Sequence, residues 1–117
     1  MEITNRKIDL AKQHGVKFCV LFSCLGLKST SAVPTVDLLK HCASIEEHLR
    51  NSGMQYCIAR FAVFPEEVFG DFHSVKQQKK LLGPLNPDTP VDFITLKDIG
   101  KAVGAIFRNP EVFSETI

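Results

Sequence analysis

The chain has 117 residues, of which 44% are hydrophobic and 23% charged, and its formal net charge is +1. This length fits one domain or part of one, and the composition excludes wholesale disorder. The near-zero charge provides no basic face for direct binding of nucleic acid. The basic cluster at residues 76–80 (KQQKK) lacks interleaved aromatic residues, so a solvated surface is favoured there over a phosphate groove.

Neither a targeting signal nor a membrane segment is expected. The polar first residues do not form a charged region followed by an apolar one, so we expect no signal peptide. No apolar run approaches the roughly 20 residues that span a bilayer. We therefore expect a cytoplasmic protein, with the nucleus as the alternative, whose four cysteines are reduced thiols.

The first part of the chain predicts a helix followed by a strand. Apolar residues at helical spacing indicate a helix over residues 2–14, which Gly15 ends. Residues 16–22 (VKFCVLF) form an apolar run typical of a central parallel strand covered on both faces, and Ser23 follows this run. Residues 26–34 are rich in Gly, Ser, Thr and Pro and predict a loop.

A second helix is expected to begin at Thr35 or Asp37 and to end at Gly53. Glu46 and Arg50 are predicted to form an i, i+4 pair on the solvent side of this helix. The opposite side carries an apolar stripe, which indicates packing on the sheet. The stripe consists of Leu38, Cys42, Ile45 and Leu49.

The histidines and cysteines do not have the spacing of a metal site. His41 and His48 lie seven residues apart, whereas two helical ligands usually lie three or four apart, so we interpret both as polar helix residues. No two cysteines form a C-x-x-C pair. The sequence therefore predicts no metal site.

A second strand is predicted at Gln55–Phe61, which completes a strand–helix–strand unit with a right-handed crossover. Residues 62–74 and 83–90 are expected to be loops, and residues 91–95 a short strand. The first of these loops follows the carboxyl end of a strand, where ligands contact open α/β sheets. The alternative is that the phenylalanines of this loop pack against the domain and do not contact a ligand.

The last predicted element is a third helix, capped by Thr95 or Asp98 and stopped at Asn109-Pro110. Its spacing predicts an apolar inner face. This face consists of Ile99, Val103, Ile106 and Phe107.

Two motifs with well-defined chemistry are absent from the sequence. It contains neither G-x-G-x-x-G nor G-x-x-x-x-G-K, the glycine-rich loops that cradle phosphates. Ser23 follows a strand, but its surroundings (LFSCL) do not match the G-x-S-x-G elbow of a hydrolase nucleophile.

Three segments together resemble the NmrA-like family, an atypical branch of the short-chain dehydrogenase superfamily. They are residues 11–26 (AKQHGVKFCVLFSCLG), 45–68 (IEEHLRNSGMQYCIARFAVFPEEV) and 93–113 (FITLKDIGKAVGAIFRNPEVF). Within the family, the chain is most similar to the NmrA-like redox-sensor proteins of animals.

This resemblance implies an α/β fold, a partial Rossmann-like, NAD(P)-binding domain made of the later half of a parallel sheet with flanking helices. The resemblance covers residues 1–117 and implies a domain truncated at its N-terminus, without the glycine-rich βαβ unit. Members of the family are redox sensors or transcriptional co-regulators that bind NADP, and some relatives are reductases. NADP is therefore the implied cofactor, although no glycine-rich loop is present to hold its pyrophosphate.

The resemblance also assigns positions to individual residues. Leu38 stands where the superfamily has its catalytic tyrosine, and Cys42 where it has its catalytic lysine; neither can replace those groups in proton transfer. Because the tyrosine and the lysine are both replaced, the resemblance implies no catalytic residue. Glu67 replaces an asparagine and would repel a phosphate. The cofactor-facing positions correspond to Ser23, Cys42, Phe64, Pro65, Glu66 and Glu67.

Three functions remain open at this stage. The first is a non-catalytic, regulatory or redox-sensor-like protein that acts through protein contacts, either with a partner or with itself. The alternative is an NADP(H)-binding, oxidoreductase-like protein with a residual cofactor site. The third is a thiol-based sensor. Its candidate thiols are Cys19, Cys24, Cys42 and Cys57.

Overall fold

The computed structural model describes residues 2–27, 37–66, 72–79, 88 and 90–117. These residues belong to two compact units, which are described separately. The first unit consists of Met1–Phe61 and Val103–Ile117, and the second of Ala62–Ala102.

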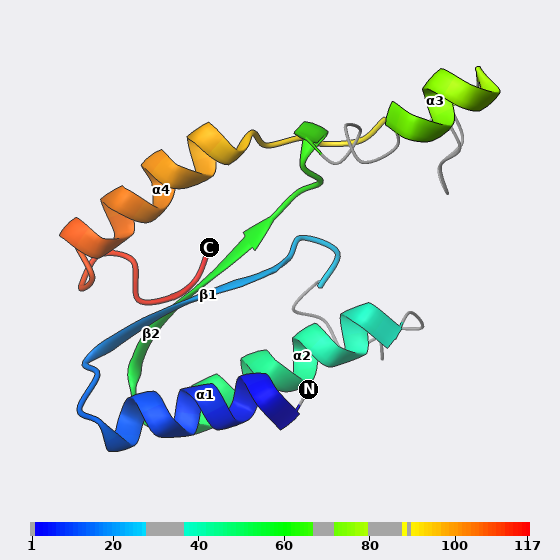
Figure 1. Cartoon of the computed structure of the whole chain (residues 1–117). Helices are drawn as coiled ribbons and strands as arrows, with labels where there is room; N and C mark the ends of the chain where they lie inside the picture. The colour runs from blue at the N-terminus through cyan, green and yellow to red at the C-terminus, as the bar shows by residue number, and fades with distance from the viewer. Residues whose placement is uncertain (1, 28–36, 67–71, 80–87, 89) are drawn as a thin grey trace. The chain divides into compact units, whose positions relative to one another are not determined.

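The first unit is built on a parallel sheet whose strand order is β1-β2-β3. Figure 1 labels two of these strands, β1 and β2. Each strand of the β1–α2–β2 crossover unit begins after a short turn that follows a helix. Helix α4 begins in the second unit and ends in the first. The elements are α1 (Glu2–Gln13), β1 (Phe18–Cys24), α2 (Asp37–Asn51), β2 (Gln55–Phe61), α4 (Leu96–Arg108) and β3 (Glu115–Thr116).

Both faces of this sheet are covered, as the apolar runs predict. On one face, Ile58 of β2 packs with Ile8 of α1 and Leu49 of α2. On the other face, Cys57 and Ala59 pack with Ile106 from the end of α4. Neighbouring residues of a strand point to opposite faces, so the continuous apolar sequence of β2 supplies both clusters.

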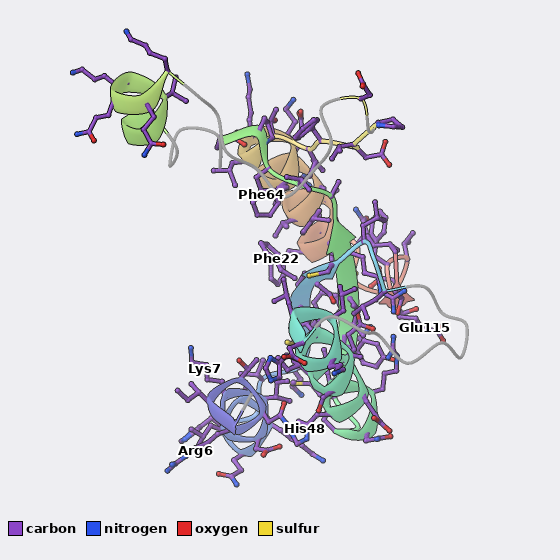
Figure 2. The ribbon with its side chains drawn as sticks, turned by 90° about the vertical axis from the view of Figure 1, so that its right-hand side faces the viewer. Arg6, Lys7, Phe22, His48, Phe64 and Glu115 are labelled. Atoms are coloured by element: carbon purple, nitrogen blue, oxygen red, sulfur yellow. The ribbon has the colours of Figure 1, made fainter. Side chains whose placement is uncertain are left out.

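Local signals explain where the helices of this unit end. Gly15 and Gly53 have φ angles of 76° and 72°, a conformation that favours glycine, and they lie in the turns that lead into β1 and β2. The outer side of α1 is mixed: Figure 2 shows Arg6 and Lys7 pointing away from the sheet, and Ile3 and Leu10 are 72% and 42% exposed. His48 joins the two helices, because its Nε2 lies 2.8 Å from Oδ1 of Asp9.

The second unit contains the start of α4 and a short helix, α3 (Phe72–Gln78). The expected loop at residues 62–74 therefore ends earlier than predicted, because α3 begins within it. The expected strand at residues 91–95 is reduced to one parallel bridge, between Val63 and Phe93. Residues 83–87 and 89 of the other predicted loop lie outside the described residues.

Thr95, one of the two residues predicted to cap this helix, caps α4. The amide of Asp98 donates to Thr95 Oγ1 at 3.2 Å, and the Thr95 hydroxyl donates to Asp98 Oδ2 at 2.9 Å. The helix ends at Arg108, directly before Asn109-Pro110. On its inner face, Ile99 and Ile106 are buried, but Phe107 is largely exposed.

No helix in the described ranges is both long enough and apolar enough to cross a membrane.

Candidate functional site

A buried carboxylate lies at the centre of the polar contacts between the sheet and α2. Glu46 is only 1% exposed. The prediction that Glu46 and Arg50 pair on the solvent side of α2 is therefore wrong for Glu46. Position 46 follows Cys42 by four residues, so it lies on the same side of the helix as part of the apolar stripe.

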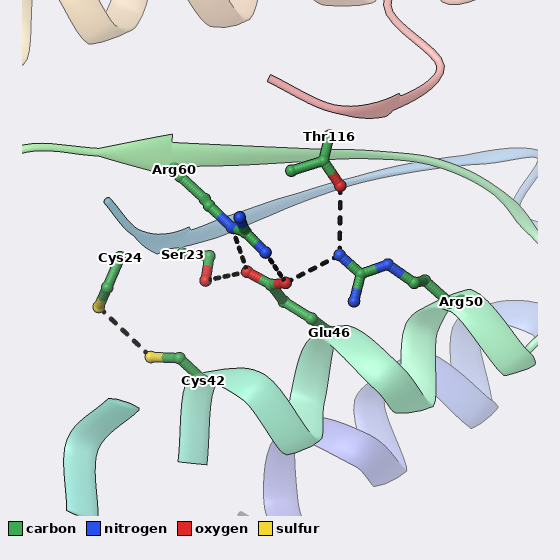
Figure 3. A network of polar contacts seen from close by, with 7 residues as sticks. All are labelled: Ser23, Cys24, Cys42, Glu46, Arg50, Arg60 and Thr116. Carbon is green, nitrogen blue, oxygen red and sulfur yellow. Dashed lines mark hydrogen bonds and ion pairs between the residues drawn. The ribbon is translucent and has the colours of Figure 1, made fainter. Parts of the chain in front are cut away.

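Side chains from two strands and from α2 itself donate to this carboxylate (Figure 3). The Ser23 hydroxyl donates to Oε1 at 2.6 Å. Arg60 donates from Nε to Oε1 at 3.0 Å and from Nη2 to Oε2 at 2.7 Å. Arg50 Nη2 donates to Oε2 at 2.9 Å and to Thr116 Oγ1 at 3.2 Å. Each oxygen of Glu46 thus accepts two hydrogen bonds.

The strand register explains how these groups come together. Ser23 of β1 lies directly opposite Arg60 of β2, so both side chains emerge on the same face of the sheet. That face is the one covered by α2, which carries Glu46. Thr116 of β3 lies opposite Ile58, and this places its hydroxyl within reach of α2.

These contacts determine the protonation state of the carboxylate. Burial raises the pKa of Glu46, but the hydrogen bonds from Arg60, Ser23 and Arg50 outweigh it and hold the pKa below its usual range. The hydrogen bond to Glu46 raises the pKa of Arg60. Glu46 is therefore a charged, fully bonded group at neutral pH, suited to holding the sheet and helix together and not to moving protons.

Two thiols meet next to this carboxylate. The Sγ atoms of Cys24, at the end of β1, and Cys42, on α2, are 3.4 Å apart (Figure 3). Burial, followed by the hydrogen bond to Cys24, raises the pKa of the Cys42 thiol to about 11. Cys42 is therefore almost entirely protonated at neutral pH.

The structure gives different surroundings to Leu38 and Cys42, the two positions at which the resemblance leads one to expect a tyrosine and a lysine. Leu38 is 62% exposed, so its assignment to the inner apolar stripe of α2 is wrong. Cys42 is partly buried and in contact with Cys24. Helix α2 begins at Asp37, and the first turn of a helix is exposed where no neighbouring element covers it.

Ser23 lies within β1 and not after its end, because the strand extends to Cys24. Its side chain is buried and its hydroxyl is used by Glu46. The resemblance gives Ser23 a cofactor-facing role, whereas in this structure its hydroxyl donates to an internal acceptor, Glu46.

The other predicted cofactor-facing residues lie in the second unit. Glu66 accepts a hydrogen bond from the backbone N–H of Leu96, the first residue of α4, at 3.0 Å. Its Oε2 is buried and has no hydrogen-bond partner among the described residues. Phe64 and Pro65 precede Glu66, and both are partly buried. Glu67 lies outside the described residues.

Comparison with known proteins identifies the family. The sequence profile of the NmrA-like family matches residues 1–117, which is the whole chain. The chain belongs to the NmrA-like family. Among solved structures, it is similar to a nucleoside-diphosphate-sugar epimerase from Staphylococcus aureus, with a TM-score of 0.75 and 21% identity. That match covers 97% of this chain but only 39% of the epimerase chain. No curated protein sequence matches significantly.

The fold of this NmrA-like chain is confirmed as α/β, with a parallel sheet flanked by helices as in part of a Rossmann-like domain. NADP is the cofactor that the resemblance to the family implies. The described residues do not fit it well, because Ser23 is bonded to Glu46 and the first amide of α4 is bonded to the Glu66 carboxylate. A helix N-terminus that already holds a carboxylate does not offer that amide to a phosphate.

Sequence reasoning missed Arg60 altogether. The available signal was an arginine inside an otherwise apolar strand, since a buried arginine needs an acid partner. No group of histidine, cysteine or acidic residues that could hold a metal ion occurs within the described part of the NmrA-like chain.

Proposed function

We propose that this NmrA-like domain is a non-catalytic, redox-sensor-like regulator that acts through protein contacts. The observation that carries the proposal is the exposed edge of β1. The strand order is β1-β2-β3, and within the described ranges β1 pairs only with β2. A strand with one unpaired side offers backbone groups to a strand of another protein.

The backbone pattern identifies which groups lie on that open side. The amide of Leu25 donates to the carbonyl of Phe61 at 3.0 Å, so the amides of odd-numbered residues in β1 face β2. In a strand, each residue directs its N–H and its C=O to the same side, and successive residues alternate between the two sides. Phe22 therefore directs its N–H and C=O away from β2, toward the open side.

Apolar side chains accompany this edge. Phe22 is 54% exposed, and Leu25, the residue after β1, is 51% exposed. The ring of Phe22 rests edge-on against Phe61, with centroids 5.0 Å apart and an interplanar angle of 83°. Figure 2 shows the position of Phe22 on β1. An open strand with exposed apolar side chains favours pairing with another chain.

The state of the polar groups supports the non-catalytic part of the proposal. Leu38 and Cys42 replace the tyrosine and lysine that the resemblance would place there, and neither supplies their proton transfer. The nearby Glu46 carboxylate is saturated by Ser23, Arg60 and Arg50, so it is not free to act as a base.

Self-association of the purified chain tests the proposal, because its only available partner is a second copy. We expect the mass measured by light scattering to rise with concentration. Phe22→Pro removes the outward N–H without removing a bond to β2, whereas Phe22→Ala removes the same ring but keeps that N–H. Dissociation should therefore be stronger in Phe22→Pro than in the matched Phe22→Ala control.

The result that would overturn the proposal is a chain that stays monomeric at every concentration and unfolds cooperatively with high stability. Equal association of the Phe22→Pro and Phe22→Ala variants, with unchanged circular dichroism, would also contradict a role for the β1 backbone.

The second candidate function is an NADP(H)-binding, oxidoreductase-like protein. It is favoured by family membership and by the position of Glu66, which follows the carboxyl end of β2, where ligands bind in open α/β sheets. Titration with NADPH, followed by calorimetry, tests it. Micromolar affinity would support it, and the absence of heat at millimolar NADPH would exclude it.

A further inference from the structure

Two cysteines that are remote in sequence are positioned as a thiol pair. Cys24 ends β1 and Cys42 lies in the second turn of α2, 18 positions later. Their Sγ atoms are 3.4 Å apart, and both residues are only partly buried (Figure 3). This separation exceeds the length of a disulfide bond by only about 1.4 Å, since bonded sulfur atoms lie about 2.0 Å apart.

We propose that Cys24 and Cys42 are a redox modification site that forms a reversible intramolecular disulfide when the chain meets hydrogen peroxide. A small rotation of the two side chains closes the remaining gap, because both sulfur atoms already face each other. The site goes beyond the proposed function, since disulfide formation requires neither a protein partner nor a dinucleotide.

The chemistry balances with peroxide as the oxidant. The sulfur of Cys24 attacks one peroxide oxygen, the O–O bond breaks, and a sulfenic acid and one water result. The sulfur of Cys42 then attacks the sulfenic sulfur, and the hydroxyl group leaves with the Cys42 proton as a second water. Two thiols lose two electrons, which reduce one peroxide to two waters.

The order of the two steps follows from the surroundings of the thiols. Cys42 lies one helical turn before the charged Glu46, and its raised pKa keeps it protonated at neutral pH. The thiolate is the attacking form in both steps, so Cys42 suits the second step, in which the oxidised sulfur lies 3.4 Å away and this proximity offsets its small thiolate fraction.

The other two cysteines are not placed for this reaction. Cys57 is completely buried in the cluster that includes Ile106, and Cys19 packs on the opposite face of the sheet. Burial raises the pKa of both thiols, which lowers their reactivity. The disulfide is therefore expected only between the pair that lies outside the two apolar clusters.

The disulfide would link β1 and α2, the two elements that the Ser23–Glu46 hydrogen bond already joins. Ser23 precedes Cys24 on β1, and its partner Glu46 follows Cys42 by one turn of α2. The disulfide therefore adds a covalent link beside an existing hydrogen bond. We expect the unfolding temperature of the oxidised chain to rise by roughly 5–10 °C, which dithiothreitol should reverse.

Peptide mapping tests the proposal directly. The purified full chain is treated with hydrogen peroxide, alkylated to block free thiols, and digested with trypsin without reduction. Cleavage after lysine and arginine places Cys24 in residues 18–28 and Cys42 in residues 41–50. We expect these two peptides to be joined in monomeric protein, with a mass about 2 Da below their sum.

Two variants identify the participating sulfur atoms. Residues 18–28 also contain Cys19, so Cys19→Ser should keep the linked peptide, whereas Cys24→Ser should lose it. Cys42→Ser should lose it as well, with all variants checked by circular dichroism. Linkage through Cys19, or independent overoxidation of Cys24 and Cys42 in the wild-type chain without any link, would overturn the proposal.

Discussion

Two carboxylates of this NmrA-like chain have similar partners but very different surroundings. Glu46 accepts hydrogen bonds from a hydroxyl and two arginines and is 1% exposed. Asp98 accepts from the Thr95 hydroxyl at 2.9 Å and from Lys101 Nζ at 2.8 Å, but it is exposed. The pKa of each is lowered, in Glu46 against burial and in Asp98 first by its hydrogen bond to Lys101.

The difference shows that the surroundings, more than the number of contacts, determine the energetic importance of a charged group. An exposed carboxylate that loses its partner regains water. A buried carboxylate that loses its partner keeps an uncompensated charge, which costs far more.

Removing the bidentate partner of Glu46 should have the largest effect. Arg60→Met retains much of the side-chain length but leaves the buried carboxylate with only Ser23 and Arg50, so we expect a loss of about 3 kcal/mol in the free energy of unfolding. Urea denaturation at neutral pH measures it. The matched variant Arg50→Met removes a more exposed arginine and should cost at most about 1 kcal/mol. Equal losses of stability in Arg60→Met and Arg50→Met would contradict the expectation that burial determines the cost.

Acid should weaken the Glu46 cluster. Because the pKa of Glu46 in the folded chain lies below the usual value of 4.5, its contribution is complete above that value and is lost as the pH falls through the lower folded pKa. The urea midpoint of the wild type should therefore fall more steeply below about pH 4.5 than that of Glu46→Gln. Parallel pH profiles of the two proteins would show that the pKa of Glu46 in the folded chain is not lowered.

The cap of α4 should have a moderate effect. Thr95→Ala removes the side-chain acceptor of the Asp98 amide, so we expect a loss of about 1 kcal/mol in the free energy of unfolding. Thr95→Ser keeps the hydroxyl oxygen and serves as the control, with stability close to that of the wild type. Thermal unfolding followed by circular dichroism measures both, and an unchanged Thr95→Ala variant would exclude the capping role.

The exposed ion pair should have the smallest effect. Asp98→Asn removes the charge that faces Lys101 but leaves the Thr95 cap in place, so we expect no measurable change in the urea midpoint in ordinary salt. The same experiment with Lys101→Met tests the pair from its other side. A clear loss in either variant would mean that burial is not what distinguishes Asp98 from Glu46.

Sequence periodicity predicted most of the elements because it reports local geometry. The strand Gln55–Phe61 was predicted with its observed bounds, and Gly15, Gly53 and Thr95 mark helix ends as expected. The apolar runs also predicted a parallel sheet covered on both faces. Both ends of β1 were placed two residues too early, and α3 and β3 were not predicted, since none of these elements has a strong boundary signal.

The spacing of apolar residues predicted the succession α1, β1, α2, β2 and α4, the α/β class and the two-sided burial of the sheet, because each depends on the pattern within one element. It predicted neither α3 nor β3, and the strand expected at residues 91–95 is a single bridge. Only the tertiary structure decided that Glu46 is buried, that Arg60 is its partner and that Cys24 meets Cys42. These contacts depend on the register of β1 against β2 and on the rotation of α2 over them. Register and rotation are set by the packing of the whole sheet, so the spacing along any single element does not contain them.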